Sequence, residues 1–430
     1  MRYFDFGVTK MKNVEKIGKK IYYILHSEEF KERHRMQEKD FTRKRKMGFA
    51  QVSTVILKGV KRGLQAGITE FLDETKSDIN EYSKAAFCKA RQRISPDAFK
   101  ELFEVTASEY YTSGEYKTFQ GYRVCAIDGS DINLPNTQEL FEKYGSEPYG
   151  NGIIQVQSLV SCLYDVMNHV ILDASMNPYY CDERKAALEH LEKLDKIRTD
   201  KELLIMDRGY PSEELMTAIE AKGFKYLIRV NKNNFFREIR DTNDDDVILC
   251  RKTKHGELQY RLVLITLKNG TVEALITNLT ESAVTKQMLS ELYQMRWGIE
   301  TKYNDLKNKL QIENFSGITP LCILQDFYST LFLSNILAYV EADYAEDIEK
   351  INSSEKYKLE YKMNTNHAVF VLRKSVVEML LTDSSKQQRK IFSNIEREFK
   401  RCLSPVRKGR YFPRNHRHLS SLFANNRKLN

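Results

Sequence analysis

The sequence has few cysteines, and none of them is arranged as a metal-binding pair. Seven cysteines are scattered over 430 residues, and no two of them are separated by only two residues. Their odd number and irregular spacing favour a reducing compartment. The same spacing argues against a zinc site built from cysteines.

Long hydrophobic runs are also missing. The longest apolar stretch, residues 321–340, is interrupted by Gln325, Asp326 and Asn335. It therefore predicts a buried core helix rather than a membrane span. Residues 1–20 have no apolar run after their charges, so no secretion signal is expected. Together these absences predict a soluble, cytoplasmic chain with no membrane partner.

Acidic residues are scarce at both ends of the chain. Residues 1–63 hold 17 Lys/Arg against 7 Asp/Glu, and residues 386–430 hold 13 against 2. The middle is therefore net negative, although the whole chain carries +9. Basic ends either aid solubility or grip a polyanion. The tail 407–414 interleaves its cations with Tyr411 and Phe412, which favours contact with nucleic acid.

The apolar patterns predict three regions. Residues 1–115 are expected to form a helical, basic DNA-binding region. Residues 116–330 are expected to form an α/β core, and residues 331–430 a helical region that ends in the basic tail. Neither an internal repeat nor a low-complexity tract interrupts this order.

One N-terminal segment is a candidate for DNA contact. Ser83 is a capping residue before a predicted alanine-rich helix that reaches Ile94. Lys89, Arg91 and Arg93 on that segment could face a duplex.

The core is expected to contain a mixed sheet covered by helices. A buried strand over 122–127 ends at Asp128, and another over 202–206 ends at Asp207. Between them the pattern predicts two strands and a helix, over 153–166, 169–175 and 183–194. Residues 223–280 alternate or are β-branched, and they contain an Asn-Gly turn signal. This last segment predicts an antiparallel β insertion in the α/β core.

Four polar residues near the end of the core share a helical spacing: Tyr293, Arg296, Glu300 and Lys307. At 3.6 residues per turn, offsets of 3, 7 and 14 place them on one face of a single helix. A neighbouring apolar stripe would anchor this helix to a core. The stripe comprises Leu292, Met295, Ile299, Tyr303, Leu306 and Leu310. Taken alone, an Arg and a Glu four residues apart are more often a surface ion pair.

Asp128, Asp207 and Glu300 are the candidate metal ligands. Carboxylates beside apolar strands need a compensating cation, and carboxylates from separate elements suit Mg²⁺ or Mn²⁺. Two such ions can activate a nucleophile and stabilise the departing oxygen of a phosphodiester. Arg296 and Lys307 would then neutralise phosphate charge. Each aspartate alone could equally be a turn or cap residue, and Asp131, expected beyond the strand end, might serve instead.

The combination resembles the DDE transposases of the insertion-sequence-four type. The resemblance covers about residues 120–320, and the order of its motifs also matches. The matching residues are Asp128-Gly-Ser, Asp207-Arg-Gly-Tyr210 and the Y-R-E-K row Tyr293, Arg296, Glu300 and Lys307.

The resemblance implies a ribonuclease-H-like catalytic core interrupted by the β insertion. Asp128 would lie on the first strand, Asp207 after the fourth, and Glu300 on a later helix. Asp128 would bridge two Mg²⁺ or Mn²⁺ ions, and Asp207 and Glu300 would each complete the shell of one ion. The expected DNA contacts are Tyr293, Arg296, Lys307 and Arg208.

The implied activity is cut-and-paste transposition. The chain would bind the terminal inverted repeats of its own element as a homodimer in the synaptic complex. It would hydrolyse one strand and join the freed 3′-hydroxyl to double-stranded target DNA. Its location would be the bacterial cytoplasm, at the nucleoid.

Several alternatives stay open. A related nuclease without strand transfer would share the three acids, and a transposase-derived DNA-binding protein would keep the basic ends. Retroviral-type integrases are disfavoured because the His/Cys spacing of a zinc finger is missing. Excision through a hairpinned DNA end is also open. The one tryptophan, Trp297, is expected to be a packing residue, so a flipped base would need Phe235, Phe236 or Tyr260.

Overall fold

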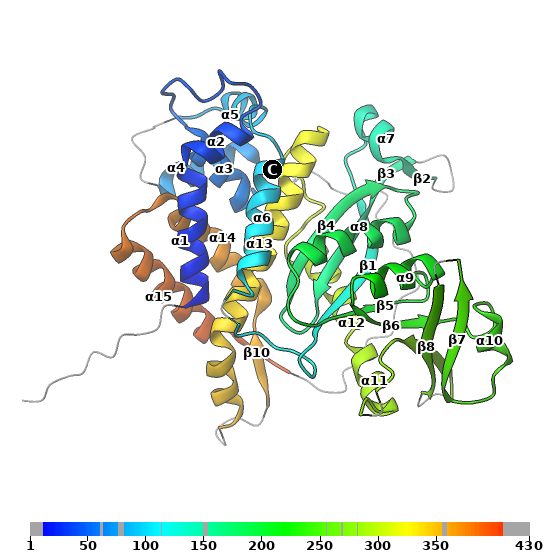
Figure 1. Cartoon of the computed structure of the whole chain (residues 1–430). Helices are drawn as coiled ribbons and strands as arrows, with labels where there is room; N and C mark the ends of the chain where they lie inside the picture. Colours follow the sequence, from blue (N-terminus) through cyan, green and yellow to red (C-terminus); the bar gives the residue numbers. More distant parts are fainter. Residues whose placement is uncertain are drawn as a thin grey trace, which may run out of the picture. The chain divides into compact units, whose positions relative to one another are not determined.

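The computed structural model divides the chain into two compact units (Figure 1). The described residues are 12–60, 63–75, 81–112, 114–148, 154–254, 256–267, 270–281, 283–354 and 359–406. We call residues 1–110 and 306–430 the helical unit, and residues 111–305 the sheet unit. This division differs from the expected boundaries at 115 and 330, because both ends of the chain contribute to one helical core. The basic tail 407–414 lies outside the described residues.

The helical unit is built around the long helix α13 (Pro320–Asn352), which packs on α3, α6 and α1. The Thr319 hydroxyl caps this helix by accepting a hydrogen bond from Cys322. Its most apolar 18-residue window is 83% buried inside the structure, as expected for a core helix. The other elements are α1 (Asn13–His26), α2 (Glu28–His34), α3 (Phe49–Lys58), α4 (Leu64–Glu74), α5 (Lys84–Arg91), α6 (Asp97–Glu109), β10 (Tyr361–Met363), α14 (Thr365–Leu381), α15 (Ser385–Arg401) and β11 (Leu403–Pro405).

The sheet unit contains one mixed sheet of nine strands. Its strands are β1 (Arg123–Asn133), β2 (Ser146–Pro148), β3 (Ile154–Asp165), β4 (Val170–Pro178), β5 (Glu202–Met206), β6 (Lys225–Val230), β7 (Asp246–Thr253), β8 (Gly256–Thr266) and β9 (Val272–Thr277). Its helices are α7 (Gln138–Tyr144), α8 (Glu183–Lys196), α9 (Glu213–Ala221), α10 (Arg237–Asp241), α11 (Lys286–Gln294) and α12 (Trp297–Asn308).

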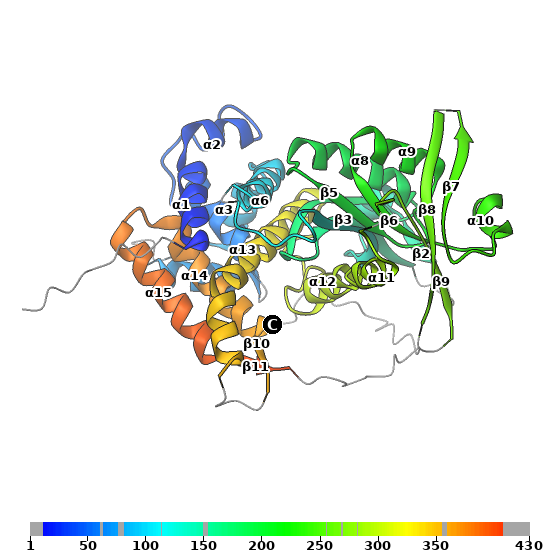
Figure 2. The same cartoon turned by 60° about the horizontal axis from the view of Figure 1, so that its bottom comes forward.

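Strand order explains how the sheet positions its acids. The order is β2-β3-β1-β5-β6-β9-β8-β7, and β4 pairs with β3. Strand β1 is antiparallel to β3 but parallel to β5, and β5 is parallel to β6. Helices α8 and α9 cover one face of the sheet, and α11 and α12 cover the other (Figure 2). The prediction of a mixed sheet covered by helices is therefore confirmed.

The β insertion is a continuation of this sheet. Strand β6 pairs in parallel with β5 and so belongs to the core sheet, although it was expected to lie inside the insertion. Strands β9, β8 and β7 then extend the sheet by antiparallel pairing. The insertion into the core sheet therefore comprises only β7, β8 and β9. The pairing of β9 with β6 covers the sheet edge that β6 would otherwise expose.

Strand β1 is longer than the sequence predicts. It was expected to end at Ile127, but it runs to Asn133, and Asp128 pairs with Cys162 of β3. Pairing with β3 supplies the backbone partners that carry the strand past its apolar part. Asp131 lies within this strand rather than beyond it. Because side chains alternate along a strand, Asp131 points to the face opposite to Asp128.

The single helix expected over 293–307 is wrong. Helix α11 ends at Gln294 and α12 begins at Trp297, so Tyr293 lies on α11 and Arg296 in the connecting turn. In this turn the amides of Arg296 and Ile299 bond to carbonyls three residues earlier, at 3.0 and 3.1 Å. Such tight turns align side chains three residues apart. Tyr293 and Arg296 therefore keep a common direction despite the break.

Candidate active site

Asp128 and Asp207 lie side by side at neighbouring parallel strands. Ile127 of β1 pairs with Met206, the last residue of β5, and the two aspartates directly follow this pair. Glu300 lies in the first turn of α12. The sheet unit therefore brings three acids from three elements to one region, in agreement with the order expected from the sequence.

Arg296 connects two of these acids. Its guanidinium places Nη2 at 2.8 Å from Glu300 Oε1 and Nη1 at 3.6 Å from Asp128 Oδ2. Arg296 is only 2% exposed, whereas the side chains of Asp128 and Glu300 are 20% and 35% exposed. A buried guanidinium between two carboxylates offsets their mutual repulsion.

Asp207 has its own arginine, which the sequence analysis missed. Arg229 of β6 donates from Nη2 to Asp207 Oδ1 at 2.7 Å and from Nη1 to Glu273 Oε1 of β9 at 3.1 Å. Tyr293 donates its hydroxyl to Asp207 Oδ1 at 3.2 Å. The available signal was an arginine that follows the apolar run Tyr226, Leu227 and Ile228 inside a strand. The charge of Asp207 is thus balanced from the sheet itself.

Tyr303 fastens α12 to the sheet below the acids. Its hydroxyl lies 2.8 Å from the carbonyl oxygen of Asp128 and 3.0 Å from that of Val160. Tyr303 was expected only as part of the apolar stripe, of which Leu292, Ile299 and Tyr303 are buried. This contact ties the helix that carries Glu300 to the strand that carries Asp128.

Burial controls the electrostatics of Asp128. It raises the pKa of the Asp128 carboxyl to about 6, against the opposing effects of the Gly129 amide and of Arg296. The nearby carboxylates of Glu183 and Glu300 raise that pKa further. Burial also raises the pKa of the Tyr293 hydroxyl. Tyr293 is therefore a hydrogen-bond donor to Asp207 at neutral pH.

The three acids have the chemistry of a Mg²⁺ or Mn²⁺ site, since all their donor atoms are carboxylate oxygens. Within the described ranges, no three His, Cys, Asp or Glu side chains stand close enough together to enclose an ion. Their nearest cationic partners are instead the guanidinium groups of Arg296 and Arg229. The donor set thus fits the expected ions, while ion binding requires these ion pairs to rearrange.

The remaining predicted DNA contacts occupy different positions. Arg208 is exposed directly after Asp207. Lys307 is half-buried on α12, seven residues after Glu300, and it belongs to the helical unit. Tyr293 and Arg296 are buried, at 4% and 2% exposure.

The aromatic candidates also separate. Trp297 was expected to be a packing residue, but it is 46% exposed, and the Arg296 guanidinium lies 5.0 Å from its ring centre. It starts α12, where its side chain turns to solvent. Phe235 and Phe236 stack at 3.9 Å between ring centres and are half-buried, whereas Tyr260 is fully buried. Of the three rings proposed for a flipped base, Tyr260 is the least accessible.

Arg91, a candidate for contact with a duplex, has a structural position instead. It is 2% exposed, and its three guanidinium nitrogens all donate to partners in the helical unit. These are Gln325 Oε1 at 2.6 Å, Ser316 Oγ at 2.6 Å, the Cys322 carbonyl oxygen at 2.9 Å and Asp326 Oδ1 at 2.7 Å. The expected role in DNA contact is therefore wrong for Arg91, because a fully bonded, buried guanidinium cannot reach a phosphate.

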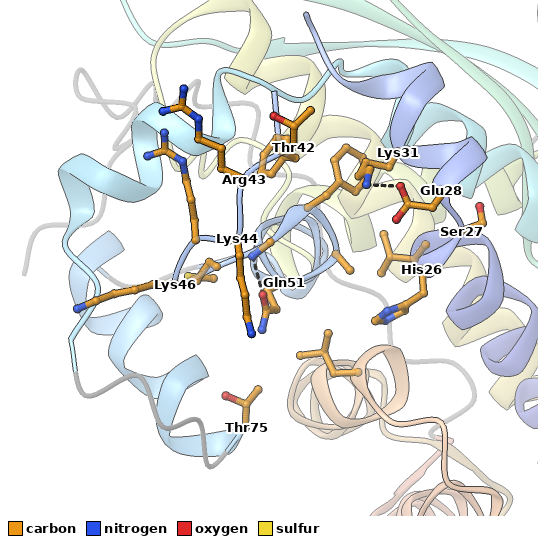
Figure 3. A pocket seen from close by; sticks show the side chains of 18 of the residues that line it. His26, Ser27, Glu28, Lys31, Thr42, Arg43, Lys44, Lys46, Gln51 and Thr75 are labelled. Atoms are coloured by element: carbon orange, nitrogen blue, oxygen red, sulfur yellow. Dashed lines mark hydrogen bonds and ion pairs between the residues drawn. The ribbon is translucent and has the colours of Figure 1, made fainter. Parts of the chain in front are cut away.

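The helical unit also contains a basic cavity of about 940 Å³ (Figure 3). Residues 43–46 before α3 supply four consecutive exposed cations to its lining, Arg43, Lys44, Arg45 and Lys46. Lys31 also lines the cavity and is paired with Glu28. A concentration of cations around one cavity suits an anionic partner.

The sequence is similar to a known family and to two curated proteins. The family described as "Transposase DDE domain" matches residues 119–336. "Transposase InsG for insertion sequence element IS4" of Escherichia coli (strain K12) is 25% identical over 281 residues, 62% of this chain and 62% of that protein. "Putative transposase InsZ" of the same organism is 28% identical over 152 residues, 34% of this chain and 49% of that protein. The chain thus spans less than two thirds of the curated relatives it matches.

Among solved structures, the piggyBac transposase synaptic complex with hairpin DNA covers 89% of this chain and 85% of its own, with 10% identity and a TM-score of 0.47. The family match includes Asp128, Asp207 and the whole row from Tyr293 to Lys307. Because the family match covers more than half of the chain, the chain belongs to the DDE transposase family and is related to the transposases of insertion sequence IS4.

Proposed function

We propose that the chain is a transposase that binds the terminal inverted repeats of a mobile element, cleaves one strand there and transfers it to target DNA. One observation carries the proposal: Arg296 pairs with both Asp128 and Glu300, and Asp207 follows the neighbouring strand, where Arg229 and Tyr293 bind it. The Arg296 guanidinium also lies 5.8 Å from the ring centre of Tyr293, which brings the two groups together. An isolated surface ion pair would need none of this arrangement.

Asp128, Asp207 and Glu300 would hold two divalent ions, Mg²⁺ or Mn²⁺. Such ions, when bound, supply an activated water or hydroxyl and stabilise the departing oxygen. Asp128 would bind both ions, because Arg296 links it to Glu300 and because Asp207 follows the neighbouring parallel strand. The strand order supports a ribonuclease-H-like core, with Asp128 on the first strand of the β1, β3, β4, β5 set and Asp207 after the fourth.

The chain's own side chains would position the DNA. Exposed Arg208 follows Asp207 directly and would bind a backbone phosphate near the cleaved bond. Arg296, once released from Glu300 or Asp128, would pair with a phosphate oxygen, and Tyr293 would hold Asp207 in place during this exchange. Lys307 would contact the strand further along α12.

The helical unit would supply DNA binding that does not depend on the base sequence of the DNA. The cations at 43–46 lie exposed at the basic cavity, and residues 1–63 carry 17 Lys/Arg against 7 Asp/Glu. Neutralised phosphates give affinity that falls steeply with salt. In the full proposal, two copies of the chain bind two element ends in a synaptic complex at the bacterial nucleoid.

The test uses a labelled duplex that ends in the inverted repeat flanking the reading frame, with Mg²⁺ or Mn²⁺ and a target plasmid. We expect a nick that frees a 3′-hydroxyl, followed by labelled plasmid. Asp128→Asn, Asp207→Asn and Glu300→Gln should each lower both products at least about 10³-fold, as losses of groups that act as a unit do.

Glu189→Gln is the control, since it removes a carboxylate charge from an exposed position of the same unit, on α8. Its products should stay near the wild-type level. DNA binding without metal-dependent cleavage would contradict the enzymatic proposal. Cleavage without strand transfer would show that the protein is a nuclease and not a transposase.

A further inference from the structure

A fourth carboxylate, which the sequence motifs do not include, lies beside the three acids. Glu183 is the first residue of α8, and Asp182 caps this helix. An acidic residue in a first helical turn commonly does no more than interact with the helix dipole. Two contacts of Glu183 go beyond that role.

The first contact is with Gly129, the residue after Asp128. Glu183 Oε1 lies 2.9 Å from the position that a Cβ atom on Gly129 would occupy. Asp128 Oδ1 accepts a hydrogen bond from the amide of the same glycine at 3.0 Å. The carboxylates of Glu183 and Asp128 therefore lie on either side of one residue. Glu183 Oε2 is also 3.9 Å from the Cβ position of Gly209, two residues after Asp207.

The second observation is Tyr210, which ends the Asp207 motif. It is 1% exposed, and its hydroxyl has no hydrogen-bond partner of acceptable geometry among the described residues. That hydroxyl interacts electrostatically with the carboxylates of both Glu183 and Asp128, and burial with these neighbours raises its pKa. A buried hydroxyl that lacks a hydrogen-bond partner is unfavourable, so that of Tyr210 needs an acceptor when the site is complete. The Tyr210 hydroxyl would hold the Glu183 carboxylate in place by a hydrogen bond, as the Tyr293 hydroxyl holds that of Asp207.

Acids therefore approach this edge from both faces of the sheet. Glu300 comes from α12 on one face, and Glu183 comes from α8 on the other (Figure 2). Burial, with the charges of Asp131, Asp182 and Asp207, raises the pKa of Glu183. Divalent cations are the natural counter-charge for such a concentration of carboxylates.

We infer that Glu183 is a fourth carboxylate of the divalent-ion site, held by Tyr210 and admitted by Gly129. The inference rests on the proposed function, because it assumes that Asp128, Asp207 and Glu300 bind Mg²⁺ or Mn²⁺. It assigns a role to the glycine after Asp128, since any larger residue there would displace Glu183.

The test measures binding of Mn²⁺ alone to the full chain by the electron paramagnetic resonance signal of the free ion. Glu183→Gln should weaken Mn²⁺ affinity about tenfold or more, a size typical for groups that support a metal site. Glu189→Gln is the matched control, since Glu189 is exposed on the same helix and loses the same charge. Asp207→Asn is the reference for the site itself.

The outcomes separate the two proposals. Wild-type affinity in Glu183→Gln, with weakened binding in Asp207→Asn, would overturn this inference and leave the proposed function standing. Unchanged binding in Asp207→Asn would overturn the metal site and the inference together. If Glu183→Gln fails to fold by circular dichroism, Tyr210→Phe decides. The inference predicts weaker Mn²⁺ binding in that variant, whereas a Glu183 that only interacts with the helix dipole predicts unchanged Mn²⁺ binding.

Discussion

Arg91 in the helical unit and Arg296 in the sheet unit are buried to the same extent, at 2% exposure, yet their surroundings differ. Every guanidinium nitrogen of Arg91 donates to a partner, and Asp326 accepts in return. Arg296 pairs with Asp128 and Glu300, but within the described ranges its buried Nε has no partner.

The difference distinguishes a structural arginine from one at the proposed catalytic site. Arg91 belongs to a closed network that would lose hydrogen bonds in any rearrangement. Arg296 is held by two partly exposed carboxylates that repel each other and that a divalent ion would bind in its place. Burial alone therefore does not distinguish these two arginines, whereas the completeness of their hydrogen bonding does.

The largest effect on stability is expected at Arg91. Arg91→Met leaves the carboxylate of Asp326, which is 8% exposed, without its cation. Breaking a buried pair in this way typically costs about 3–5 kcal/mol of unfolding free energy. Urea unfolding followed by circular dichroism measures the loss.

Arg401→Met is the control, because the Arg401 side chain is 68% exposed and that of its partner Glu398 is 31% exposed. It should cost less than about 1 kcal/mol. Equal losses for the two variants would remove the distinction between a closed network and a surface charge.

A smaller but metal-dependent effect is expected at Arg296. Arg296→Met leaves Asp128 and Glu300 without their shared cation, at a cost of about 2 kcal/mol when no divalent ion is added. Added Mn²⁺ should then raise the Tm of the variant more than that of the wild-type chain, because ion binding no longer displaces the guanidinium. Thermal unfolding with and without Mn²⁺ measures both quantities.

Lys302→Met serves as the control for this variant. Lys302 lies on the same helix but donates to the carbonyl oxygen of His169. Its Mn²⁺-dependent rise in Tm should match that of the wild-type chain. An equal rise in all three proteins would show that Arg296 does not compete with the ion.

The smallest effects are expected at helix caps, where the two units should behave alike. The side-chain oxygens of Ser83 and Thr285 each accept from the amide three residues later, both at 3.2 Å. Ser83→Ala and Thr285→Ala should each cost about 1 kcal/mol of unfolding free energy. A clear inequality between them would show that stability at the caps depends on the unit and not only on the local contact.

The sequence predicted the type and order of most elements that carry the site. Strand 202–206 and the helix that starts at residue 183 agree with the structure, because apolar periodicity reports burial directly. The break between α11 and α12 was missed, because the 3.6-residue pattern continues through it. The end of β1 was also missed, since its polar half is held by pairing with β3 rather than by apolar residues.

Local pattern thus determined the three acids, their order and the kind of element that holds each one. Tertiary structure alone decided which cations and which further acid surround them. Arg229 meets Asp207 only because β5 and β6 pair, and Glu183 reaches Gly129 only because α8 packs on β1. Arg91 finds Asp326 across 235 positions of sequence. Charge balance depends on distances in space, and no spacing along the chain encodes those distances.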